Sequence, residues 1–91
     1  MKRYQIIYEG IVQGVGFRWN LIMIARALNL TGFAKNQSNG NVLVEIQGKQ
    51  EAIDDFFQKS LNIKSNFIEI YDYHIKQILV NEGETIFDVK Y

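Results

Sequence analysis

The chain has 91 residues, 47% of them hydrophobic, so its length and composition predict one domain, residues 1–91, with a core of its own. Ten basic and ten acidic residues balance, which argues against a general polyanion binder. The chain has no cysteine, which excludes disulfides and thiolate metal sites. It has neither a hydrophobic run of membrane-spanning length nor an apolar signal segment at its start, so we expect a cytoplasmic protein.

The first predicted elements are a strand, a glycine loop and a helix. Residues 4–11 are rich in aromatic and β-branched types, with alternation that predicts a strand. Residues 18–30 carry apolar side chains at helical spacing, and we expect Trp19 to pack near the start of this helix. The connection contains Gly14 and Gly16, two positions apart.

This glycine loop has the features of an anion site. Two glycines let successive backbone N–H groups converge on an anion, and the following helix adds its unpaired first amides and positive dipole end. No Ser, Thr or Asp stands at the helix start to cap those amides. Arg18 would add a planar fork of donors suited to phosphate. The alternative is an ordinary glycine turn followed by a solvated arginine.

A hairpin follows the first helix. Residues 33–37 predict a second strand, and residues 42–47 alternate as a third. Between them stands Asn39-Gly40, the strongest hairpin signal in the chain.

The second half predicts one helix and two more strands. Residues 51–61 have an amphipathic helical pattern, and residues 66–75 form a fourth strand in which aromatic and isoleucine positions compete for the buried face, so we expect a bulge. Residues 87–91 alternate as a final edge strand. The only histidine, His74, lies on the fourth strand, and we expect it at the surface without a metal-binding partner.

The order β-α-β-β-α-β plus one strand predicts an α+β fold with one antiparallel sheet and both helices on one face. If the first strand runs upward, the glycine loop lies at the top, and the second strand also ends at the top. Arg18 and Asn36 should therefore share one end of the sheet. An Asn beside a hairpin is by default a turn residue. Its carboxamide could also hold a water molecule and donate to phosphate.

Two segments carry a resemblance to a known family. Gly10-Ile11-Val12-Gln13-Gly14-Val15-Gly16-Phe17-Arg18 and Gly32-Phe33-Ala34-Lys35-Asn36-Gln37-Ser38-Asn39-Gly40-Asn41-Val42 resemble the two motifs of acylphosphatases. The resemblance implies a ferredoxin-like α/β sandwich that hydrolyses the carboxyl–phosphate bond of acyl phosphates. It departs from the family at Asn39, where Asp is frequent, at Ala34, where Val is usual, and in lacking the Gly-Pro pair before the fourth strand.

The resemblance also implies roles for individual residues. Arg18 and Asn36 would be catalytic, with Arg18 binding the phosphoryl group and Asn36 positioning the attacking water. The phosphate would be held by Gln13, Gly14, Val15, Gly16, Phe17 and Arg18. The family uses no metal and no organic cofactor. The expected partners are a small-molecule acyl phosphate and the product inorganic phosphate, with no nucleic acid and no membrane, and we expect a monomer.

Two other functions remain as alternatives. One is a non-catalytic acylphosphatase-like module that binds a phosphoanion without turning it over. The other is an RNA-binding domain of the same topology, which would need basic residues interleaved with exposed aromatic residues on the first and third strands. The third strand has no aromatic residue and carries Glu45, which disfavours RNA. Release of phosphate from acetyl or benzoyl phosphate separates the enzyme from the module.

Overall fold

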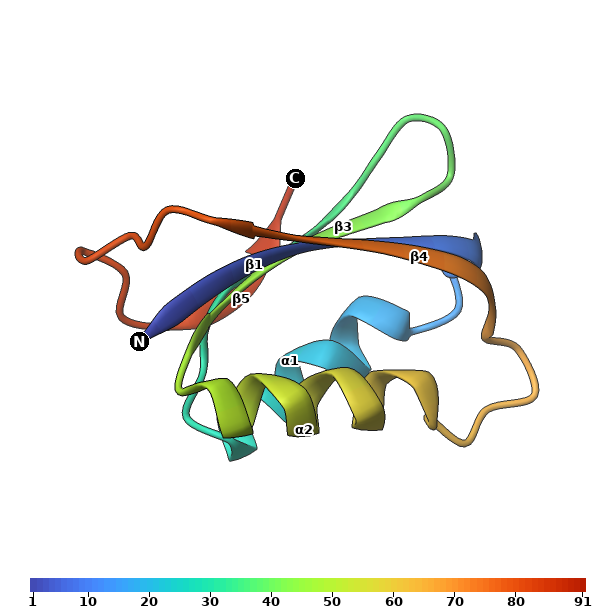
Figure 1. Ribbon diagram of the computed structural model, residues 1–91. Helices are drawn as coiled ribbons and strands as arrows, with labels where there is room; N and C mark the ends of the chain where they lie inside the picture. Colours follow the sequence, from blue (N-terminus) through green and yellow to red (C-terminus); the bar gives the residue numbers. More distant parts are fainter.

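The computed structural model describes all residues 1–91 and has two layers, a sheet and a pair of helices that cover one of its faces (Figure 1). The elements follow the predicted order: β1 (Lys2–Ile11), α1 (Phe17–Ala27), β2 (Thr31–Asn36), β3 (Val42–Gly48), α2 (Gln50–Leu61), β4 (Glu69–Ile78) and β5 (Phe87–Lys90). The predicted α+β sandwich is confirmed. Neither helix is long and apolar enough to cross a membrane.

The strand order across the sheet is β4-β1-β3-β2-β5, and one edge differs from the prediction. β1 pairs antiparallel with β3 and β4, and β2 pairs antiparallel with β3, but β5 pairs parallel with β2. The expectation of a purely antiparallel sheet is therefore wrong at this edge. β4 runs opposite to β1 and β2, so the strand that returns after it runs in the same direction as β2.

The core lies between the sheet and the helices. Strand alternation sends every second side chain to the helix-covered face. Ile6 and Tyr8 of β1 lie there, and Leu21 and Phe56 face them from the helices. Fifteen buried apolar residues form one cluster: Ile6, Tyr8, Val12, Phe17, Leu21, Ile22, Ala25, Leu30, Ala34, Val42, Val44, Ile46, Ile53, Phe56 and Phe87.

A bulge reconciles the side chains that compete for the buried face of β4. The β1–β4 register shifts after Glu9, because Glu9 pairs with Asp72 while Gly10 pairs with Ile70, which leaves Tyr71 without a partner. Gly10 has a φ of 144°, and a Cβ there would lie 2.1 Å from the carbonyl oxygen of Glu69. Only glycine fits this close approach. β4 also begins three residues later than predicted.

A cluster of polar side chains lies on the face of the sheet that the helices leave open. Arg3 is only 3% exposed, yet its guanidinium forms ion pairs of 2.8 Å with both Glu45 and Glu84 and donates to Gln47 at 3.1 Å. Burial alone would lower the pKa of Arg3, but the hydrogen bonds and charges of Glu84 and Glu45 outweigh burial and raise it. This cluster fastens the β4–β5 loop to the sheet.

Candidate active site

The loop between β1 and α1 is shaped by its two glycines. Gly14 and Gly16 have φ values of 73° and 80°, in the left-handed region that other residues rarely adopt. Apart from atoms of the glycine itself and its two neighbours in the chain, no heavy atom lies within 4 Å of a Cβ built on either residue. Glycine is thus required by the backbone conformation here and not by lack of space. The space around the loop is open to a ligand.

The backbone amides of this loop have no protein acceptor. None of the N–H groups from residue 13 to residue 18 donates a hydrogen bond to another protein group. Gly16 caps α1 without a side-chain hydrogen bond, and the first turn contains no acidic residue. The positive end of the α1 dipole therefore faces the loop with its donors free, which favours a bound anion.

Arg18 stands in the first turn of α1 and is half-buried. No carboxylate contacts it, and its guanidinium carbon lies 5.4 Å from the centroid of the Tyr91 ring, within the range of a cation–π contact. Arg18 lines an open cavity of about 260 Å³ together with Val12, Gly14, Gly16, Phe17, Trp19, Ile22, Val89 and Tyr91. Trp19 is 62% exposed at this rim, so the expectation that it packs at the helix start is wrong.

Asn36 is the last residue of β2, and alternation with the buried Ala34 directs it to the helix-covered side of the sheet. Its pairing partner Val42 is also buried on that side. The carboxamide oxygen Oδ1 of Asn36 is buried and has no hydrogen-bond partner. A buried acceptor without a partner is rare in folded proteins and points to a ligand or to ordered water.

The register of β2 and β5 relates Asn36 to Arg18. Lys35 pairs with Lys90, so the next residues, Asn36 and Tyr91, stand at the same level of the sheet. Since the Tyr91 ring lies against the Arg18 guanidinium, Arg18 and Asn36 lie at one end of the molecule and on one side of the sheet. No hydrogen bond joins them. Asn36 also borders a second cavity of about 480 Å³.

Gln13 has a structural role that the sequence did not reveal. Its side-chain Nε2 donates to the carbonyl oxygens of Gln37 at 2.7 Å and Asn41 at 2.8 Å. These two carbonyls lie on either side of the β2–β3 turn, which Asn39 closes by accepting a bond from the backbone N–H of Asn41. Gln13 thus ties the glycine loop to the hairpin that carries Asn36. A lone Gln after a strand gives no sequence signal for such a contact.

These features fit one class of protein, a two-layer α+β domain with a glycine loop of free backbone amides at one end of its sheet. Residues 4–89 match the sequence pattern of the family described as acylphosphatase. The chain belongs to the acylphosphatase family.

Acylphosphatases of other organisms are similar to this chain in sequence and structure over its full length. An acylphosphatase of Clostridium beijerinckii is 38% identical over 91 residues, which cover 100% of both chains. The crystal structure of an acylphosphatase from Bacillus subtilis superposes with a TM-score of 0.92 at 34% identity, again covering 100% of both chains.

The same domain also resembles part of a larger protein. The chain aligns with full-length HypF, whose structure is described as phosphate- and nucleotide-bound, with a TM-score of 0.92 and 29% identity. The match covers 99% of this chain but 12% of HypF. The fold therefore occurs both at the size of this chain and within a longer polypeptide.

Proposed function

We propose that Arg18 and the backbone amides of residues 13–17 bind the phosphoryl group of an acyl phosphate, while Asn36 orients the water that attacks phosphorus. The reaction is the one that the family carries out, hydrolysis of the carboxyl–phosphate bond to a carboxylate and inorganic phosphate. The observation that carries these roles is the buried, unpartnered Oδ1 of Asn36 at the end of the sheet where the free loop amides lie. That oxygen can accept a hydrogen bond from water.

The proposed reaction requires no side chain that acts as a general acid. An acyl phosphate is a mixed anhydride, and its carboxylate leaves readily without a dedicated general acid. The transition state of phosphoryl transfer is usually loose, with negative charge on the equatorial oxygens. Those oxygens would meet the Arg18 guanidinium and the loop N–H groups, and the Asn36 carbonyl would fix the direction of the water. We propose that the reaction needs no metal ion, so activity should be the same in EDTA.

Replacement of Asn36 tests the water-orienting role. Asn36→Ala should lower turnover by about 100-fold, the scale on which loss of one preorganised polar group acts. Phosphate binding should persist, because Arg18 and the loop amides remain. The measurements are phosphate release from benzoyl phosphate and phosphate titration followed through the loop amide resonances. Ser38→Ala, at an exposed position of the same hairpin whose side chain makes no hydrogen bond, serves as the control and should keep near-normal turnover. Normal turnover in Asn36→Ala would refute the role.

A non-catalytic phosphate-binding module is the second candidate, since the chain also resembles a 12% portion of HypF. Phosphate binding without any release from acetyl or benzoyl phosphate would favour it over the enzyme. The identity of the acyl group follows from comparing carbamoyl, acetyl and glycolytic acyl phosphates. The monomeric state stays a prediction that analytical sedimentation measures. The cytoplasmic location stays a prediction that cell fractionation measures.

A further inference from the structure

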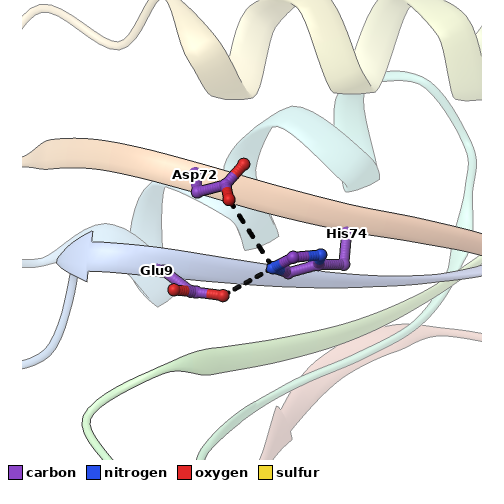
Figure 2. Close-up of side chains that lie close together, drawn as sticks. All are labelled: Glu9, Asp72 and His74. Atoms are coloured by element: carbon purple, nitrogen blue, oxygen red, sulfur yellow. Dashed lines mark hydrogen bonds and ion pairs between the residues drawn. The ribbon is translucent and has the colours of Figure 1, made fainter.

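Three side chains of types that bind metal ions meet on the face of the sheet opposite the helices. Glu9 of β1 pairs with Asp72 of β4, and His74 follows two residues later on the same face of β4, opposite Ile7. Figure 2 shows both carboxylates directed toward the same nitrogen of the imidazole ring. The prediction that His74 has no metal-binding partner missed Glu9, which lies 65 positions away and reaches His74 only through strand register.

The spacing of the three groups suits one cation. Nε2 of His74 lies 2.5 Å from Oε2 of Glu9 and 3.8 Å from Oδ2 of Asp72, and the three ligand atoms all fall within 4.8 Å of one another. Around a tetrahedral Zn²⁺ with bonds of about 2.0–2.2 Å, ligand atoms stand roughly 3.4 Å apart. Small rotations of exposed side chains would bring this set to that spacing.

No lysine or arginine forms an ion pair with Glu9 or Asp72, whose only such contacts are with His74. Glu9 and Asp72 are directly cross-strand, an arrangement in which like charges destabilise a sheet. A protonated His74 would balance only one of the two carboxylates, and a neutral imidazole would balance neither. A divalent cation bound to all three groups would balance both carboxylates.

The backbone holds these groups in place. Antiparallel pairing fixes Glu9 against Asp72, and the bulge that begins at Gly10 ends the regular ladder directly beside them. Oδ1 of Asp72 accepts a hydrogen bond of 2.8 Å from the backbone N–H of Tyr73, which leaves Oδ2 turned toward His74. Such outer hydrogen bonds orient carboxylate ligands in metal sites.

From these observations we propose that Glu9, Asp72 and His74 form a binding site for a divalent transition metal of the Zn²⁺ type. Imidazole favours Zn²⁺ over Mg²⁺, which prefers oxygen ligands and octahedral geometry. Three protein ligands leave at least one coordination position for water. The site lies on the face of the sheet opposite to α1, the helix that carries Arg18, and the proposed hydrolysis does not depend on it.

Zinc titration of the untagged full chain tests the site, because His74 is the only histidine and the chain has no cysteine. The His74 imidazole resonances should shift saturably with Zn²⁺ and stay unchanged with Mg²⁺. His74→Gln, Glu9→Gln and Asp72→Asn should each weaken zinc binding at least about tenfold, since loss of even an outer-shell partner costs about 10–100-fold. Calorimetry gives the affinities, and circular dichroism confirms that each variant folds.

Asp88→Asn is the matched control, since Asp88 is an exposed strand carboxylate on β5 at the opposite edge of the sheet. It should bind zinc like the native chain. Binding that stays unchanged in His74→Gln, or shifts that spread over all exposed carboxylates without saturating His74, would overturn the proposal. Phosphate release in EDTA is measured on the same variants. It should remain native in all of them, so failure of the metal site and failure of the proposed hydrolysis are read separately.

Discussion

Two arginines, Arg3 and Arg18, have opposite surroundings. Arg3 is 3% exposed, and its donors are taken by Glu45, Glu84 and Gln47. Arg18 is half-buried, touches no carboxylate and lies against the ring of Tyr91 beside amides that have no acceptor. One guanidinium is fully engaged within the fold, and the other keeps its donors available.

The contrast separates stability from function. A buried charge is tolerated when every donor has a partner. Removal of that charge leaves its partners buried without a counter-charge or hydrogen bond. A cation left without a carboxylate partner adds little to the fold, but its field stays available to an anionic ligand. The same residue type should therefore give opposite results when it is replaced at these two positions.

The largest effect is expected at Arg18. Arg18→Ala should reduce turnover of an acyl phosphate by about 100- to 1,000-fold, because a preorganised donor to transition-state charge is worth about 3–4 kcal/mol. The free energy of unfolding should change by less than about 0.5 kcal/mol, as for most surface substitutions. Steady-state kinetics and urea denaturation measure the two quantities.

Arg18→Lys tests whether the fork of donors matters beyond the charge. Lysine supplies the charge but not the planar bidentate geometry, so this variant should recover only part of the lost rate. Native turnover in Arg18→Ala would remove Arg18 from the proposed site and with it the functional half of the contrast.

Arg3 should show the reverse pattern. Arg3→Met keeps much of the side-chain volume but leaves Glu45 and Glu84 without their cation. We expect a loss of about 2–4 kcal/mol in the free energy of unfolding, near the range for breaking a buried ion pair by removing one partner. Turnover of the folded fraction should stay within about twofold. A stability loss below about 0.5 kcal/mol would show that the buried pairs contribute nothing net.

The part of this contrast that the sequence could predict is the placement of Arg18 and Asn36 at one end of the sheet, while their roles stay predictions. Gly14, Gly16 and Arg18 stand close together in sequence, and their spacing on a strand–loop–helix pattern indicates an anion loop without any knowledge of tertiary contacts. The position of Asn36 at the same end of the sheet could be predicted from the order and direction of the elements alone. Such signals are local or follow from topology, so they can be read before the fold is known.

The structural half could not be predicted, because it depends on register between distant segments. Arg3 and Glu84 lie 81 positions apart and meet only after the β4–β5 loop folds back over the sheet. The contact from Gln13 to the hairpin carbonyls and the approach of Glu9 to His74 are of the same kind. The parallel pairing of β5 depends on which sheet edge is free, and the sequence of β5 carries no sign of that.

Replacement of Gln13 should lower both the stability and the turnover, each by less than the replacements of Arg3 and Arg18 do. Gln13→Ala removes two hydrogen bonds to the hairpin, each worth about 1 kcal/mol, so we expect about 1–2 kcal/mol less stability. A looser hairpin should misplace Asn36 and lower turnover by about 5- to 30-fold with little change in phosphate affinity. Gln37→Ala is the matched control, because only its backbone carbonyl takes part. Equal loss in both variants would argue against a positioning role for the Gln13 side chain.

Replacement of Tyr8 should give a smaller loss of stability at neutral pH than replacement of Arg3 or Gln13 does. Like Arg3, Tyr8 is a buried polar group with a hydrogen-bond partner inside the fold. The hydroxyls of Tyr8 and Ser60 lie 2.7 Å apart, and the Tyr8 ring packs edge-on against Phe17 at 5.0 Å. Tyr8→Phe keeps the ring and should cost about 1 kcal/mol of stability at pH 7. Turnover should be unchanged, because the hydroxyl faces α2 and not the loop.

Alkaline pH gives Tyr8 a distinct signature. Burial raises the pKa of its hydroxyl more than the hydrogen bond with Ser60 lowers it, so the folded chain holds this proton where the unfolded chain releases it. The contribution of the Tyr8 hydroxyl to the free energy of unfolding is constant below about pH 10. Above that pH it falls by up to about 1.4 kcal/mol per pH unit. Denaturation of Tyr8→Phe between pH 9.5 and about 11.5 should lack this slope. Equal slopes in native and Tyr8→Phe protein would show that Tyr8 ionises freely in the fold.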